Sequence, residues 1–115
     1  PMVSHDAIGF YLLSEEVSKS VKVVQSGQGA DEVFAGYHWY PAMAKSNAPE
    51  DDYSRVFCDR DHAEMKTALE AHRVQRDYSR DFIAGHFAAV GADSPIDKAL
   101  RIDSTIMLVD DPVGA

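Results

Sequence analysis

The sequence predicts a mostly α-helical chain that contains one β-strand. Apolar residues recur at helical spacing over most of its length, and residues typical of helix starts precede several of these segments. The exception is Val21–Val24, a short β-branched run between polar residues. The 115 residues are 45% hydrophobic, which is enough to bury the core of one small domain.

The first half of the chain contains a predicted helix, the strand and a second helix. The first helix is expected over Ser4–Lys19, with Ser4 as its N-cap. Val21–Val24 is the strand candidate, and a glycine-containing turn follows it. Ala30–Met43 is then predicted to form one helix that Gly36 weakens.

The second half is predicted to be helical, with one long surface loop. Ser46–Asp52 is acidic and contains a proline, so we expect a loop there. Helices are expected over residues 61–76 and 78–90 and from residue 94 onward. Asp61 and Glu64 form a capping-box pattern, and Ser94 followed by Pro95 is a strong helix start signal.

A lone strand leaves its backbone N–H and C=O groups without a neighbour in a sheet. We therefore expect residues 1–115 to be an excised part of a larger domain. Apolar surface that the larger domain would cover predicts self-association of the chain.

The formal net charge is −8, from 19 acidic and 11 basic residues. This balance argues against nucleic acid or an anionic membrane as a partner, because both need basic patches. ATP stays compatible, since nucleotide sites use backbone N–H groups and a metal ion. No apolar run could span a bilayer, and the single cysteine, Cys58, fits a reducing compartment, so we expect a cytoplasmic protein.

The residues most suited to chemistry are those between Val23 and Glu32. The expected strand leads into the turn Ser26–Gly29 and then into a helix start, where backbone N–H groups and the helix dipole favour an anion. Asp31 in the first helical turn would repel a phosphate unless a cation such as Mg²⁺ lay between them. By spacing alone this signal is weak, and it is more typical of an ordinary strand–turn–helix connection.

Ser26–Tyr37 closely resembles the signature S-G-E-G-[AS]-D-E-x-F-x-G-Y of asparagine synthetases. Ala7–Val24 resembles the helix and strand before that signature, and Leu100–Asp103 resembles a later helix of the family. The resemblance implies that residues 1–115 belong to an α/β domain of the ATP-pyrophosphatase type (adenine nucleotide alpha hydrolase-like), without the glutaminase domain.

The family's reaction implies a role for each residue of the turn. ATP adenylates a side-chain carboxylate and releases pyrophosphate, and ammonia from glutamine then displaces AMP. By position, Ser26, Gly27 and Gly29 would contact the nucleotide, and Asp31 would bind Mg²⁺ and pyrophosphate. Gln28 would contact the reacting carboxylate substrate.

Gln28 departs from the family, which has Glu at this position. An amide cannot carry charge or accept a proton as a carboxylate does, which argues against plain asparagine synthesis. Gln28 together with Tyr37–Pro41 resembles the bacterial branch that amidates the dipeptide N-acetylglutaminylglutamine.

Other parts of the family's active site are not found in the 115 residues: the N-terminal Cys, the S-G-G-x-D-S pyrophosphate loop and the late catalytic Lys. Catalysis needs these groups together, so we expect the chain alone to be inactive and to bind ATP weakly or not at all. The alternative is a non-enzymatic helical interaction module whose glycine turn is only structural.

Two further groups of residues have an open role. Cys58 and His62 could share a helix face, but two ligands are too few for a zinc site. Tyr37, Trp39 and Tyr40 either line a substrate pocket or pack in the core, and the sequence leaves both readings open.

Overall fold

The computed structural model describes residues 5–110, and these form helices and irregular connections without a strand. In chain order the helices are α1 (His5–Ser18), α2 (Ala30–Phe34), α3 (Tyr40–Met43), α4 (Pro49–Phe57), α5 (His62–Ala68), the 3₁₀ helix η1 (Ala71–Arg73), α6 (Tyr78–Ala88), α7 (Pro95–Ile102), the π-helix η2 (Asp103–Met107) and α8 (Leu108–Asp110). The predicted mostly helical character is confirmed. The predicted N-cap, Ser4, lies outside the described residues.

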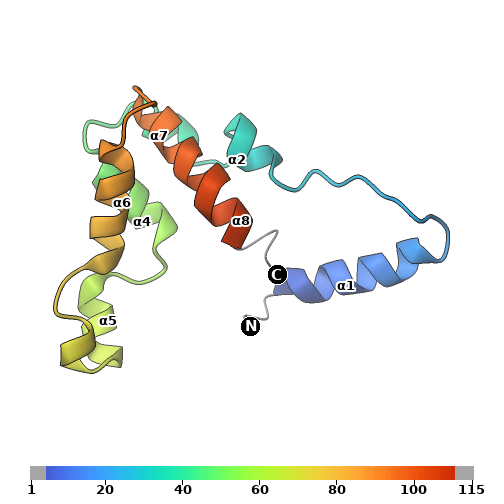
Figure 1. Ribbon diagram of the computed structural model, residues 1–115, viewed down its shortest axis with the longest axis horizontal. Helices are drawn as coiled ribbons and strands as arrows, with labels where there is room; N and C mark the ends of the chain where they lie inside the picture. Colours follow the sequence, from blue (N-terminus) through green and yellow to red (C-terminus); the bar gives the residue numbers. More distant parts are fainter. Residues whose placement is uncertain (1–4, 111–115) are drawn as a thin grey trace.

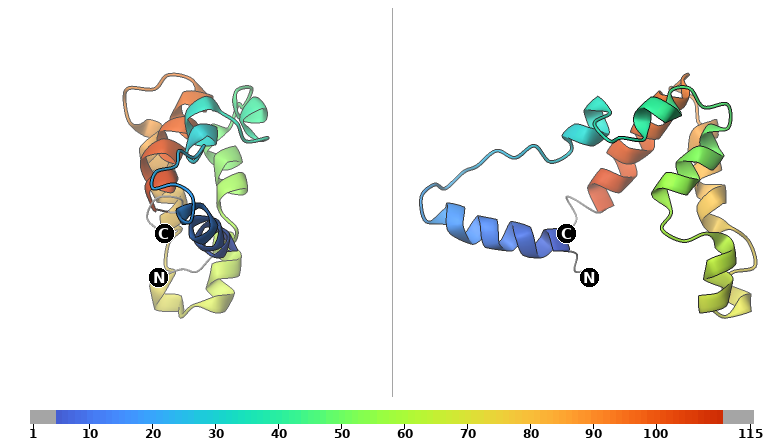
Figure 2. Two further views of the ribbon diagram at one scale, coloured as in Figure 1. Left: turned by 90° about the vertical axis from the view of Figure 1, so that its right-hand side faces the viewer. Right: turned by 180° about the vertical axis from the view of Figure 1, so that it is seen from behind.

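Helices α3, α4, α6 and α7 pack together, whereas α1 stands apart at the end of a long extended connection (Figure 1). The view from behind, at the right of Figure 2, shows the same separation. The radius of gyration is 17.1 Å, compared with about 13 Å for a compact chain of this length. The packed helices, rather than the whole chain, therefore form the folded unit that positions a site.

The core is small and draws on each of the four packed helices. Its buried residues are Tyr40, Met43, Tyr53, Ile83, Phe87, Ala99 and Ile102. Two of its largest members are tyrosines, so the core must also satisfy buried hydroxyl groups.

Helix α1 exposes large apolar side chains around its circumference. The exposed residues are Ile8, Phe10, Tyr11, Leu12 and Leu13. A helix that is apolar on all sides is normally buried, so α1 presents an unfilled packing surface. Neither α1 nor another helix within residues 5–110 has the length and apolarity needed to cross a membrane.

The predicted strand Val21–Val24 is wrong for this structure. The segment is irregular and its side chains face solvent, with Val23 84% and Val24 66% exposed. A strand is stable only when neighbouring strands accept and donate its backbone hydrogen bonds, and residues 5–110 supply none. The segment therefore forms part of the extended connection between α1 and α2.

The predicted single helix Ala30–Met43 is also wrong, because the chain turns between α2 and α3. Ala35 adopts a left-handed conformation with φ 57°, and the N–H of Gly36 donates to the carbonyl of Asp31 at 2.9 Å. This is the hydrogen-bond pattern of a helix C-terminus. Pro41 then lies in the first turn of α3, where its missing N–H removes no helical hydrogen bond.

The predicted loop Ser46–Asp52 is correct only in its first part, because α4 begins at Pro49. Proline suits the first turn of a helix, and the acids from Glu50 to Asp52 interact favourably with the positive end of the helix dipole. The acidic run is therefore a helix start rather than a loop.

The other helix starts agree with the sequence. Asp61 and Glu64 form the predicted capping box, and the hydroxyl of Ser94 accepts the N–H of Asp97 at 3.2 Å. The helix that begins after Asp61 ends at Ala68, earlier than predicted, because the chain reverses through η1 before α6.

Arg101 joins α7 to the end of α6. Its guanidinium donates to the carbonyls of His86, Ala89 and Val90, the last at 3.0 Å. The carbonyls of Ala89 and Val90 lie beyond the last residue of α6, at the negative end of the dipole of this helix. Arg101 thereby fixes the helix that carries Asp103 into the core.

Candidate functional site

The residues between Ser26 and Gly29 form an exposed turn immediately before α2. The N–H of Gln28 donates to the Ser26 hydroxyl at 3.4 Å, and the N–H of Ala30 donates to the carbonyl of Gly27 at 3.0 Å. Gly29, the N-cap of α2, has φ 86°, which glycine adopts without strain. The sequence correctly predicts a glycine turn that opens a helix.

Gly29 is also in close contact with the C-terminal part of the chain. A Cβ at Gly29 would lie 3.0 Å from a side-chain methyl of Leu108 at the start of α8. The turn therefore needs glycine at this position for its conformation and for its packing. Leu108 is a contact of the turn that sequence reasoning missed, because the two residues are far apart in the chain.

Asp31, the predicted metal ligand, is exposed in the first turn of α2. Within the described residues its carboxylate makes no hydrogen bond and no ion pair. The carboxylate lies against Gly36, where any Cβ would overlap it. Gly36 thus leaves the space that Asp31 occupies, and the carboxylate keeps its oxygens available to an external cation.

Glu32 is buried, although it is the neighbour of the exposed Asp31. Its side chain is 2% exposed and accepts a hydrogen bond from the Tyr37 hydroxyl at 2.5 Å. Both acids lie in the first turn of α2, and the structure separates them into an exposed and a buried carboxylate.

A second buried carboxylate lies next to Glu32. Asp103, in η2, is 1% exposed and accepts hydrogen bonds from the hydroxyls of Tyr40 and Tyr53. Burial raises the pKa of Asp103, and the charge of Glu32 adds to this effect, while the two tyrosine hydrogen bonds act to lower it. Burial and the hydrogen bonds to Asp103 raise the pKa of both tyrosines.

The aromatic residues after the turn pack on the core. Tyr40 is fully buried, and Tyr37 and Trp39 are half-buried, with their rings stacked at a centroid distance of 4.3 Å. Of the two readings that the sequence leaves open, packing is therefore the one that the structure shows for Tyr40.

Asp31 provides a single carboxylate for a metal ion. Residues 5–110 hold no group of three or more His, Cys, Asp or Glu side chains that could together bind a metal. One carboxylate is too few for zinc or calcium, but Mg²⁺ is commonly held by one or two carboxylates together with substrate phosphates and water. The donor set at Asp31 therefore fits Mg²⁺ bound jointly with a phosphate group.

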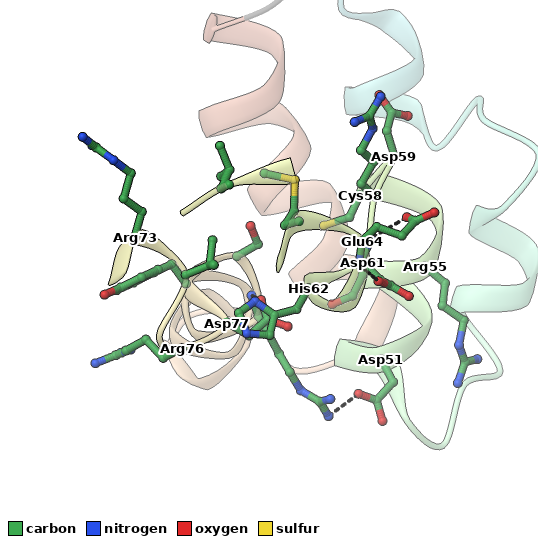
Figure 3. A pocket seen from close by; sticks show the side chains of 18 residues that line it. Asp51, Arg55, Cys58, Asp59, Asp61, His62, Glu64, Arg73, Arg76 and Asp77 are labelled. Atoms are coloured by element: carbon green, nitrogen blue, oxygen red, sulfur yellow. Dashed lines mark hydrogen bonds and ion pairs between the residues drawn. The ribbon is translucent and has the colours of Figure 1, made fainter. Parts of the chain in front are cut away.

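A cavity of ≈ 690 Å³ lies between α4, α5 and α6 and shares no residue with the glycine turn (Figure 3). Cys58 and His62 line it, but burial raises the pKa of the Cys58 thiol, with Asp77 adding to the effect, so the thiol is a poor nucleophile. Arg80 pairs with Asp51 at 2.5 Å across its edge. Within residues 5–110 the Cys58 thiol and the His62 ring form no hydrogen bond, and the turn before α2 remains the candidate site.

An exposed glycine turn followed by an outward aspartate agrees with the class of ligases whose signature Ser26–Tyr37 resembles. A family profile described as asparagine synthase matches residues 1–115, and the chain therefore belongs to the asparagine synthase family. No curated protein and no solved structure matches the chain. The resemblance found in the sequence is thus confirmed for the family, an asparagine-synthetase-type ligase family.

Proposed function

We propose that this chain is part of the synthetase domain of an ATP-dependent, glutamine-using amidotransferase with the α/β ATP-pyrophosphatase fold. In the proposed reaction a substrate carboxylate is adenylated by ATP, pyrophosphate leaves, and ammonia derived from glutamine replaces AMP to give an amide. The observation that carries the proposal is the family signature at an exposed turn whose Asp31 carboxylate has no partner among the described residues.

The roles proposed for the turn follow from its chemistry. Ser26 offers a hydroxyl, and Gly27 and Gly29 let a nucleotide approach the backbone because no Cβ blocks it. Asp31 would hold Mg²⁺, which neutralises charge on the pyrophosphate. The pyrophosphate loop, the catalytic lysine and the glutaminase reaction would come from outside these 115 residues, so we propose that the chain alone is inactive. The use of ATP favours the cytoplasm.

Gln28 would lie beside the reacting carboxylate and select the substrate. A neutral amide side chain can donate and accept hydrogen bonds at once, which suits a substrate with amide groups of its own. We therefore place the chain in the bacterial branch that acts on N-acetylglutaminylglutamine, with aspartate as the alternative substrate.

The substitution Gln28→Glu tests the proposed substrate. In a ligase that contains this chain, pyrophosphate release should be faster with N-acetylglutaminylglutamine than with aspartate. Gln28→Glu should lower the kcat/KM for the dipeptide by roughly 10- to 100-fold, because a carboxylate replaces a matched hydrogen-bonding amide. Gln75→Glu, at an exposed glutamine far along the chain, is the matched control. Equal rates for the two substrates would reject the dipeptide branch, and no pyrophosphate release with either would reject the ligase reaction.

The isolated chain should self-associate through α1, because apolar side chains cover this helix on all sides. Light scattering over a range of concentrations should show mass increasing with concentration. The double substitution Leu12→Glu and Leu13→Glu should raise the dissociation constant of this self-association by at least about 10-fold. Val90→Glu alters an isolated valine that is 95% exposed and should have little effect. A monomer at every concentration would contradict the proposal.

A further inference from the structure

Helix α2 needs support from the rest of the molecule. It has only five residues, and an isolated helix of that length is unstable in water. Of its apolar side chains, Val33 is 55% and Phe34 81% exposed, so burial of these residues does not hold it in place. Other contacts must therefore fix the helix that carries Asp31.

The contacts that fix α2 on its inner side are polar. Glu32 accepts the Tyr37 hydroxyl, and the ring of Tyr37 lies 6.0 Å from that of Tyr40, whose hydroxyl donates to Asp103. Tyr53 donates to the second oxygen of Asp103. These five residues, here called the acid–tyrosine cluster, connect α2 with α3, α4 and η2.

The acid–tyrosine cluster contains no positive charge. No Lys, Arg or His within residues 5–110 forms an ion pair with Glu32 or Asp103. Burying a carboxylate without a counter-charge is unfavourable, and an apolar residue at position 32 would cost less. A buried, hydrogen-bonded carboxylate does, however, fix the orientation of its side chain, because its oxygens must lie next to their hydrogen-bond donors.

The orientation of the Glu32 side chain determines the orientation of the Asp31 side chain. Consecutive residues of an α-helix point about 100° apart around its axis, so fixing one side chain inward fixes where its neighbour faces. Gly36 completes the arrangement, because it leaves room for the outward carboxylate of Asp31 against the backbone.

We propose that Glu32 is a positioning residue, which anchors α2 through the acid–tyrosine cluster and thereby aims the Asp31 carboxylate at its ligand. This inference rests on the proposed magnesium-binding role of Asp31. Glu32 itself is 2% exposed, so its proposed role is to orient Asp31 rather than to bind a ligand.

The experiment compares Glu32→Ala, Glu32→Gln and the control Glu50→Gln. Glu50 also lies in the first turn of a helix, but it is exposed. The first readout is the near-ultraviolet circular dichroism of the 115-residue chain. Trp39, the single tryptophan, stacks on Tyr37 and reports the state of the cluster. Glu32→Ala should reduce this signal, whereas Glu32→Gln keeps an oxygen that can accept the Tyr37 hydroxyl and should retain it.

The second readout is the Mg²⁺ concentration that gives half-maximal pyrophosphate release in a ligase containing this chain. Glu32→Ala should raise this concentration about 10-fold, and Glu32→Gln should restore most of the loss. Unchanged circular dichroism or an unchanged Mg²⁺ requirement in Glu32→Ala would overturn the inference. Asp31→Asn, measured in parallel, separates the two hypotheses, because a normal Mg²⁺ requirement in that variant rejects the role of Asp31 itself.

Discussion

Asp31→Asn should reduce Mg²⁺-dependent pyrophosphate release by about 100-fold in a ligase that contains this chain, because the proposed metal ligand loses its charge. Asp31 is exposed and makes no hydrogen bond within the described residues, so the folded state should lose less than about 0.5 kcal/mol. Steady-state kinetics over a range of Mg²⁺ concentrations measures the first quantity, and urea unfolding measures the second.

Asp81→Asn provides the control for this experiment. Asp81 also lies in the first turn of a helix and forms only an exposed ion pair with Arg76. Its replacement should leave the rate and the Mg²⁺ requirement unchanged. Full activity of Asp31→Asn at every Mg²⁺ concentration would remove Asp31 from the proposed site.

Alkaline pH should unfold the chain steeply, because Tyr40 and Tyr53 keep their protons in the folded state. Burial and the hydrogen bonds to Asp103 raise the pKa of both above the ordinary value of 10.0. Above about pH 10 the unfolded chain therefore binds fewer protons than the folded chain, and stability falls as pH rises. Each group contributes about 1.4 kcal/mol per pH unit, or roughly 3 kcal/mol for the two.

Urea unfolding at a series of alkaline pH values tests this, with tyrosinate absorbance as the second signal. Tyr53→Phe should lose about 1–3 kcal/mol near neutral pH, because one oxygen of Asp103 loses its donor. It should also show a shallower alkaline slope. Tyr78→Phe removes an exposed hydroxyl and should change stability by less than about 0.5 kcal/mol. An alkaline slope that Tyr53→Phe leaves unchanged would refute the buried role of Tyr53.

Features that depend on a few neighbouring residues were predictable from the sequence. The caps at Asp61 and Ser94 form within one helical turn, so their residue types suffice to identify them. The glycine turn at Gly29 is local in the same sense. The family of the chain was predicted from the run of residue types over Ser26–Tyr37, and the spacing of the glycines alone would not have identified it.

Features that depend on distant residues were not predictable. The strand at Val21–Val24 required partners that the described chain does not contain. The Glu32 carboxylate is held by the hydroxyl of Tyr37. Tyr37 lies just after the end of α2, and helix propensity alone does not predict where α2 ends. Asp103 meets Tyr40 and Tyr53 only after the chain has folded. An acid between the apolar residues Ile102 and Ile106 was the one available signal.

The π-helix η2 joins α7 to α8 and lies between two contacts of this continuous helix, that of Asp103 with the core tyrosines and that of Leu108 with Gly29. The N–H of Leu108 bonds to the carbonyl of Asp103, five residues earlier, so this turn accommodates one residue more than an α-helical turn. Deleting one residue here would convert it into an ordinary α-helical turn and leave the residues after it facing nearly the same way. Leu108 would then stay against Gly29, and the disturbed residues would be those of η2 itself, which carries the buried Asp103.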